Sequence, residues 1–160
     1  MTTFTKINPK LTPMLVSRQE EFLERWVKAA HAADIQYSGI ISEDILTEGP
    51  KVYTQLAGIL GRPSYSLSPR KRINPIGRAI GERRAMSGVA IEAVLEVFII
   101  FRHELWEILG ELLEDKGDAS ILEVRRRVDL YLDQLIASVA YAYTATKEKA
   151  MVGLIEKLLS

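Results

Sequence analysis

The sequence contains no cysteine and only two histidines, His31 and His103, among its 160 residues. Without cysteine the chain has no disulfide, no thiolate ligand for a metal and no cysteine nucleophile. Two histidines are too few for a histidine-rich metal centre. The sequence also lacks the GxSxG, SxxK and GxxxxGK[ST] motifs. These absences exclude most familiar catalytic arrangements, and we expect neither an enzyme nor a bound cofactor.

Net charge is also missing, because 21 basic residues balance 21 acidic ones. A net charge of zero argues against a dedicated nucleic-acid-binding protein. The longest apolar run, residues 97–101, is far shorter than a membrane span requires, so no membrane association is expected. Residues 1–13 show neither the apolar stretch nor the cleavage site of a signal peptide. We therefore expect a cytoplasmic protein.

What the sequence does have is helical periodicity over most of its length. A hydrophobic content of 48% in a chain of this size suits one globular domain. Apolar residues recur at three- and four-residue spacing, without the alternation that is typical of strands. The predicted class is all-α. We expect helices over residues 12–34, 50–60, 75–87, 90–113 and 120–160.

Proline, glycine and capping residues mark the expected helix ends. Thr12-Pro13 and Asn74-Pro75 each place a capping side chain before a proline at the first helical position. Gly49-Pro50 predicts an interruption. Gly88 is expected in the left-handed conformation after a helix end. Residues 120–123, Ser-x-x-Glu, predict a capping box.

Two of the expected helices have unusual surfaces. The helix over 90–113 is apolar all round at its centre, because Val97, Ile99 and Ile100 add a second apolar face. We expect other helices to surround it. The helix from residue 120 would be about 60 Å long at ~1.5 Å per residue, whereas a globule of this size has a radius of gyration of ~15 Å. We expect it to protrude; a kinked helix folded back on the core is the alternative.

A protruding amphipathic helix needs a partner, most simply its own copy in a parallel homodimer. The apolar register of the last helix supplies the surface. The expected dimer interface consists of Leu135, Val139, Ala142, Met151, Leu154 and Leu158. Packing of the upstream residues into the core is the alternative for that part of the stripe.

Three polar residues are candidates for ligand binding. Arg84 and Arg102 can grip a carboxylate or phosphate at two points, and an ion pair with Glu82 or Glu96 is the structural alternative. His103 and Glu107 superficially resemble HExxH, but glutamate stands where the second histidine would be, so no metal site is predicted.

Charge is distributed unevenly along the chain. Residues 62–84 are strongly basic and residues 92–118 strongly acidic, which predicts pairing within the fold or across a dimer. The basic loop at residues 70–72 can contact phosphates, but no aromatic stacking surface accompanies it, so we expect no nucleic-acid partner.

Residues 76–88, 91–98 and 101–106 resemble the N-terminal domain of RsbR-type stressosome proteins, which also precedes some histidine kinases. The family pattern is Arg-x-x-x-Gly, then a hydrophobic helix, then an arginine followed by an aliphatic or aromatic segment. Arg84 and Gly88 match the first part, and Arg102 matches the last. The resemblance covers roughly residues 12–145.

This resemblance implies a dimeric, globin-like helical fold without haem and a sensory or regulatory role. Such domains pass their state through a C-terminal helix to an effector, a STAS domain or a kinase, in the full-length protein or in another signalling protein. Residues 1–145 would then form the sensory domain, and residues 146–160 would begin a signalling linker. Two alternatives stay open: a haem-binding, globin-like gas sensor and a domain that binds a small anion.

Overall fold

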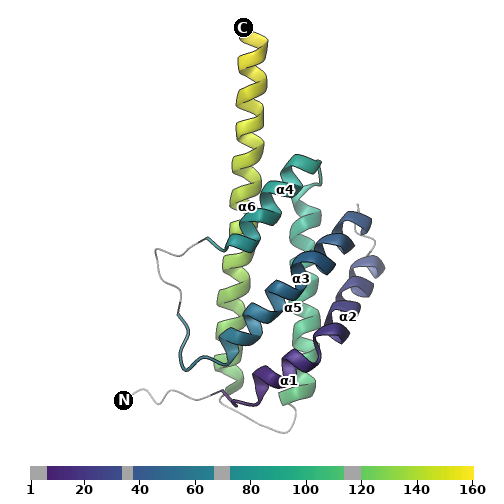
Figure 1. Ribbon diagram of the computed structural model, residues 1–160, viewed down its shortest axis with the longest axis vertical. Coiled ribbons are helices and arrows are strands. Elements are labelled where there is room, and N and C mark those ends of the chain that lie inside the picture. Colours follow the sequence, from purple (N-terminus) through teal and green to yellow (C-terminus); the bar gives the residue numbers. More distant parts are fainter. Residues whose placement is uncertain (1–6, 34–37, 67–72, 114–119) are drawn as a thin grey trace.

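The computed structural model describes residues 7–33, 38–66, 73–113 and 120–160. The described residues form six helices and no strand, which confirms the all-α class (Figure 1). The helices are α1 (Leu11–Ser17), α2 (Gln19–Ala32), α3 (Ser38–Leu60), α4 (Pro75–Ser87), α5 (Ile91–Leu113) and α6 (Ser120–Leu159). Each of these falls short of the combined length and apolarity that a membrane span requires.

Helix α4 begins and ends as its sequence predicts. The Asn74 side chain caps it by accepting hydrogen bonds from the backbone N–H groups of Ile76 and Gly77, at 2.9 and 3.4 Å. Gly88 follows the helix with a φ of 74°, in the left-handed region that glycine enters without steric cost. Both predicted ends are confirmed.

The N-terminal segment differs from the single helix expected from residue 12. It is broken at Arg18, whose φ of −104° and ψ of 13° separate α1 from α2. Thr12 is not a cap but lies inside α1, and its hydroxyl donates a hydrogen bond of 2.7 Å to the Ala57 carbonyl of α3. The capping prediction was wrong because a tertiary contact uses this hydroxyl. The predicted end near Asp34 lies outside the described residues.

The interruption predicted at Gly49-Pro50 was also wrong, since α3 runs through both residues. Proline removes one backbone donor from a helix, at a cost of about 3 kcal/mol. Buried side chains on either side of it, Ile45 and Val52, hold α3 in the core. Tertiary packing therefore outweighs the local preference.

A cluster of aromatic rings joins α2, α3 and α5. Phe101 meets Phe22 and Trp26 edge-on, with ring centroids 4.9 and 4.8 Å apart. Tyr53 packs on Phe22, and burial raises the pKa of its phenol to about 12. Ile99, on the opposite face of α5, is 64% exposed. The expectation that helices surround the centre of α5 was therefore wrong, because the core covers only one side.

A buried arginine closes the C-terminal end of α3. The guanidinium of Arg127 on α6 donates to the carbonyls of Ile59 and Arg62, at 2.9 and 2.6 Å, and to the Glu123 carboxylate at 2.8 Å. Arg126 also bonds to Glu123 and holds the pKa of that carboxyl at about 2. The capping box predicted at residues 120–123 requires Ser120 to precede the helix. In the structure Ser120 is instead the first residue of α6, and the Glu123 carboxylate bonds to arginines of the same helix.

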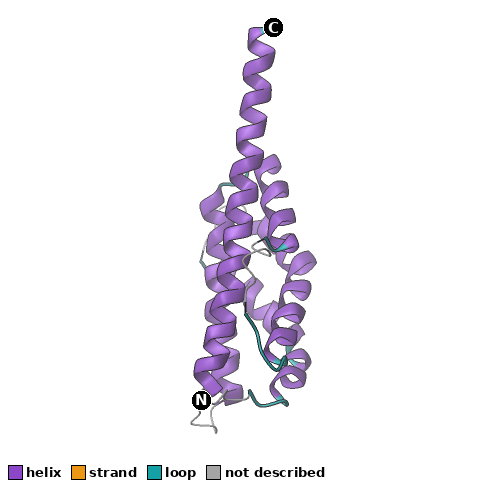
Figure 2. Ribbon diagram, turned by 90° about the vertical axis from the view of Figure 1, so that its left-hand side faces the viewer, coloured by secondary structure: helices purple, strands orange, loops and turns teal. Residues whose placement is uncertain are grey.

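Helix α6 spans 40 residues and extends beyond the other helices (Figures 1 and 2). Its inner half packs in the bundle, and no residue between 144 and 160 is buried. The predicted protrusion is confirmed. The helix is continuous across residues 145 and 146, so the division there into domain and linker stays a prediction.

Candidate functional site

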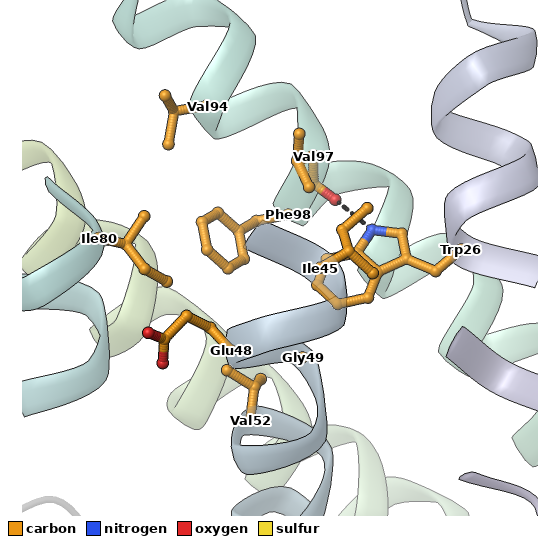
Figure 3. A pocket seen from close by; sticks show the side chains of 9 residues that line it. All are labelled: Trp26, Ile45, Glu48, Gly49, Val52, Ile80, Val94, Val97 and Phe98. Atoms are coloured by element: carbon orange, nitrogen blue, oxygen red, sulfur yellow. Dashed lines mark hydrogen bonds between the residues drawn. The ribbon is translucent and has the colours of Figure 1, made fainter. Parts of the chain in front are cut away.

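An apolar cavity of about 20 Å³ lies inside the bundle (Figure 3). Its wall includes Trp26 from α2, Ile45 and Glu48 from α3, Ile80 from α4, and Val94 and Phe98 from α5. Elements distant in the sequence therefore share one small space, to which four helices contribute.

Trp26 is fixed as one wall of this cavity. Its indole N–H donates a hydrogen bond of 2.9 Å to the Val97 carbonyl of α5. Gly49 lets α3 come close to the same ring, because a Cβ at this position would lie 2.9 Å from Leu23 Cδ2 and 3.0 Å from Trp26 Cζ3. The glycine that suggested a helix break thus serves close packing.

Glu48 places a carboxylate at the edge of the cavity. This residue is buried, with 7% of its surface exposed. Its Oε1 accepts long hydrogen bonds of 3.4 Å from both terminal nitrogens of Arg83 on α4. Lys51 Nζ lies 3.5 Å from Oε2. The pair of Glu48 and Arg83 ties α3 to α4 beside the apolar space.

An adjacent face of α4 packs against α6 through two glycines, Gly77 and Gly81. A Cβ on Gly77 would lie 2.7 Å from the Leu135 carbonyl oxygen of α6, and one on Gly81 would collide with the Val139 oxygen. Our interpretation of the sequence missed this contact, although the four-residue spacing of the glycines on one helical face was a visible signal. Only glycine allows this approach.

Hydrogen bonds hold both ends of α4 to α6. Near its start, the Ser138 hydroxyl accepts a bond of 2.8 Å from the Asn74 backbone N–H. Beyond its end, the Tyr143 hydroxyl donates one of 2.8 Å to the Val89 carbonyl. Helix α4 therefore lines the cavity with one face and is bound to α6 along an adjacent one.

The three candidate ligand residues are not among those that line this cavity. Arg84 is buried on α4. Arg102 pairs with Asp133 at 2.7 Å and Asp129 at 3.7 Å, an ion pair as in the structural alternative but with partners on α6. The side chain of His103 is 71% exposed. Ligand binding by these residues stays a prediction.

The six expected interface residues fall into two groups. Leu135, Val139 and Ala142 are buried within the chain, where α4 covers the inner half of α6. For these three the core alternative holds, and they need no second chain to cover them. Met151, Leu154 and Leu158 are 64%, 59% and 76% exposed. Of the expected interface, the part open to a partner therefore lies on the outer half of the helix.

The described ion pairs of the basic and acidic segments include partners from other parts of the chain. Arg83 pairs with Glu48 of α3. Glu111, at the acidic end of α5, pairs instead with Arg18 and Arg25. Hydrogen bonding by Arg18 lowers the pKa of the Glu111 carboxyl. The basic residues 70–72 lie outside the described residues.

Where the structure describes the chain, no group of three or more acidic or histidine side chains could hold a metal ion.

These features define a class: an all-α bundle in which one helix belongs both to the core and to a projecting arm. Comparison with protein families shows which family of such bundles the chain belongs to. The family described as RsbT co-antagonist protein rsbRD N-terminal domain matches residues 20–156, and the chain belongs to this family. This confirms the resemblance seen in the sequence, and the family is one of regulatory sensory domains.

Comparison with curated proteins gives no significant match, and comparison with solved structures gives none either. The globin-like character that the resemblance implies therefore stays a prediction.

Proposed function

We propose that this chain is a non-enzymatic sensory input and dimerisation domain of a cytoplasmic bacterial signalling protein of the stressosome or sensor-kinase type. The observation that carries the proposal is the continuity of α6, whose inner half is buried and whose outer half is exposed. One continuous helix thus joins the core of the bundle to a surface exposed outside it. Membership of the family supports the regulatory role.

The outer half of α6 has the surface of a helix that pairs with another. Met151, Leu154 and Leu158 follow one another at three- and four-residue spacing, the pattern of a coiled-coil seam. Their apolar neighbours Val152 and Ile155 are also about half exposed. Exposing so many apolar side chains to water is unfavourable, so a second copy of the helix is the partner we propose. The effector is a STAS domain or a kinase, in the full-length protein or in another signalling protein.

Sedimentation equilibrium tests this arrangement. We expect a dimer for the wild type and a monomer for Leu154→Glu, because the substitution places a charge in the seam. Lys149→Glu, on the outward face of the same helix, is the matched control and should stay dimeric. A monomeric wild type at high micromolar concentration would refute the dimerisation role.

A further inference from the structure

We propose that the cavity between α2, α3, α4 and α5 binds a small apolar molecule, of the size of a diatomic gas or a xenon atom, and that its occupant displaces α4 against α6. Binding follows from the cavity alone. The displacement of α4 against α6 rests on the proposed sensory function. It adds to that function a class of ligand and a structural connection from the cavity to α6.

The chemistry of the wall selects an apolar occupant. About 20 Å³ exceeds the space of ~10–15 Å³ that one water molecule needs. A buried water also needs two to four polar partners, and the side chains of Ile45, Val94 and Phe98 offer none. The indole N–H of Trp26 is already bonded to the Val97 carbonyl. The lining therefore favours an apolar occupant over water.

The polar edge of the cavity does not change this choice. The Glu48 carboxylate is engaged by Arg83 and lies beside Lys51. In Figure 3 the carboxylate is turned away from Trp26, so the chain of Glu48 lines the space with its carbon atoms.

The position of Ile80 links the cavity to α6. This side chain belongs to the wall, and the next residue, Gly81, lies against the Val139 carbonyl of α6. Close-packed interiors have little free volume in which to absorb a shift. A group that pushes Ile80 outward therefore shifts α4 relative to a helix that it already touches. The Glu48–Arg83 contacts of 3.4 Å, long for charged groups, are the connection to α3 that such a movement alters.

Xenon is a suitable probe, because it is apolar and its effect on protein NMR spectra can be titrated by gas pressure. We expect saturable shifts of the methyl signals of Ile45, Ile80 and Val94 in the wild type. Val94→Ile adds a methylene to the wall and should reduce these shifts severalfold. Ile99→Val, at an exposed position of the same helix, should leave them unchanged.

Absence of saturable shifts in the wild type overturns the site, as do unchanged shifts in a folded Val94→Ile variant. If that variant does not fold, Ile80→Val provides the test: it enlarges the space by one methyl group, and xenon affinity that fails to rise overturns the site. For the displacement, amide signals of Gly81 and Val139 should shift with the same midpoint as Ile80. Shifts confined to the cavity overturn the displacement.

The outcome is separable from that of the proposed function. A dimer that shows no xenon response overturns the cavity proposal alone. A monomer that binds xenon leaves the site in place and overturns the dimerisation role.

Discussion

Gly81 of α4 lies so close to the backbone carbonyl of Val139 on α6 that a Cβ atom at position 81 would collide with the carbonyl oxygen. The same Cβ would also lie 3.0 Å from that of Ala142. Backbone meets backbone at this point, and neither side can move aside as a flexible side chain would. The separation of the two helices is therefore set by the absence of a side chain.

Replacing this glycine should destabilise the protein. Gly81→Ala lowers the free energy of unfolding by about 1–3 kcal/mol, because overpacking outweighs the helix propensity of alanine, which favours the variant by ~1 kcal/mol. Urea unfolding measures the difference. Gly110→Ala in α5 is the control, since its new Cβ would meet nothing within 4 Å, and it should stabilise the protein by about 0.5–1 kcal/mol. Equal effects of the two substitutions would contradict the close contact.

Arg127 should be the most sensitive arginine of α6. Its side chain is 4% exposed, and Arg127→Met leaves the carbonyls of Ile59 and Arg62 without this donor. We expect a loss of about 2–4 kcal/mol in the free energy of unfolding. Arg125→Met, whose side chain is 70% exposed in the wild type, should change stability by less than about 0.5 kcal/mol. Similar losses in both variants would argue against this role in closing α3.

The stability contributed by Glu123 should depend on pH. Hydrogen bonding by Arg126 lowers its pKa from 4.5 to about 2 in the folded protein, so the unfolded chain binds the proton more tightly. The contribution is present above the unfolded pKa and is lost as the pH falls from about 4.5 to about 2. Glu123→Gln should cost about 1–2 kcal/mol at pH 7, and the difference from wild type should vanish near the lower limit.

Chemical denaturation at a series of pH values measures this trend. Glu148→Gln, on the exposed outer half of α6, provides the control and should follow the wild type throughout. A cost of Glu123→Gln that persists unchanged to low pH would show that the carboxylate charge is not its source.

Haem should not bind through His103. An axial histidine must open onto an apolar pocket, whereas this side chain is 71% exposed and lies 3.9 Å from Glu107. Haem titration followed by absorbance should give no ligand-dependent Soret change that differs between wild type and His103→Ala. A histidine-ligated spectrum lost in the variant would restore the haem alternative.

Local signals predicted those parts of the fold in which local chemistry decides. The Asn74 cap and the left-handed Gly88 are properties of a few adjacent residues, and both were predictable. The helix interruption predicted at Pro50 was wrong, because buried residues on both sides of it hold α3 together. The break at Arg18 has neither glycine nor proline to announce it.

The candidate site was less predictable, because periodicity shows that a face is apolar but not what covers it. Leu135 and Leu154 lie in the same stripe of α6, yet α4 covers the first and leaves the second exposed. The cavity is assembled from single residues of four helices, such as Trp26 and Ile80, which no motif connects. Such a site emerges only from the packing.

Because α6 is one continuous helix, a tilt of its inner half would also move its outer half. From residue 143 to its end at Leu159 the helix extends about 25 Å at ~1.5 Å per residue. A tilt of about 5° where Gly81 abuts the helix would carry the tip sideways by roughly 2 Å over that length. Under the proposed sensory role, a displacement too small to disturb the bundle would thus become a change in spacing at the far end of the helix.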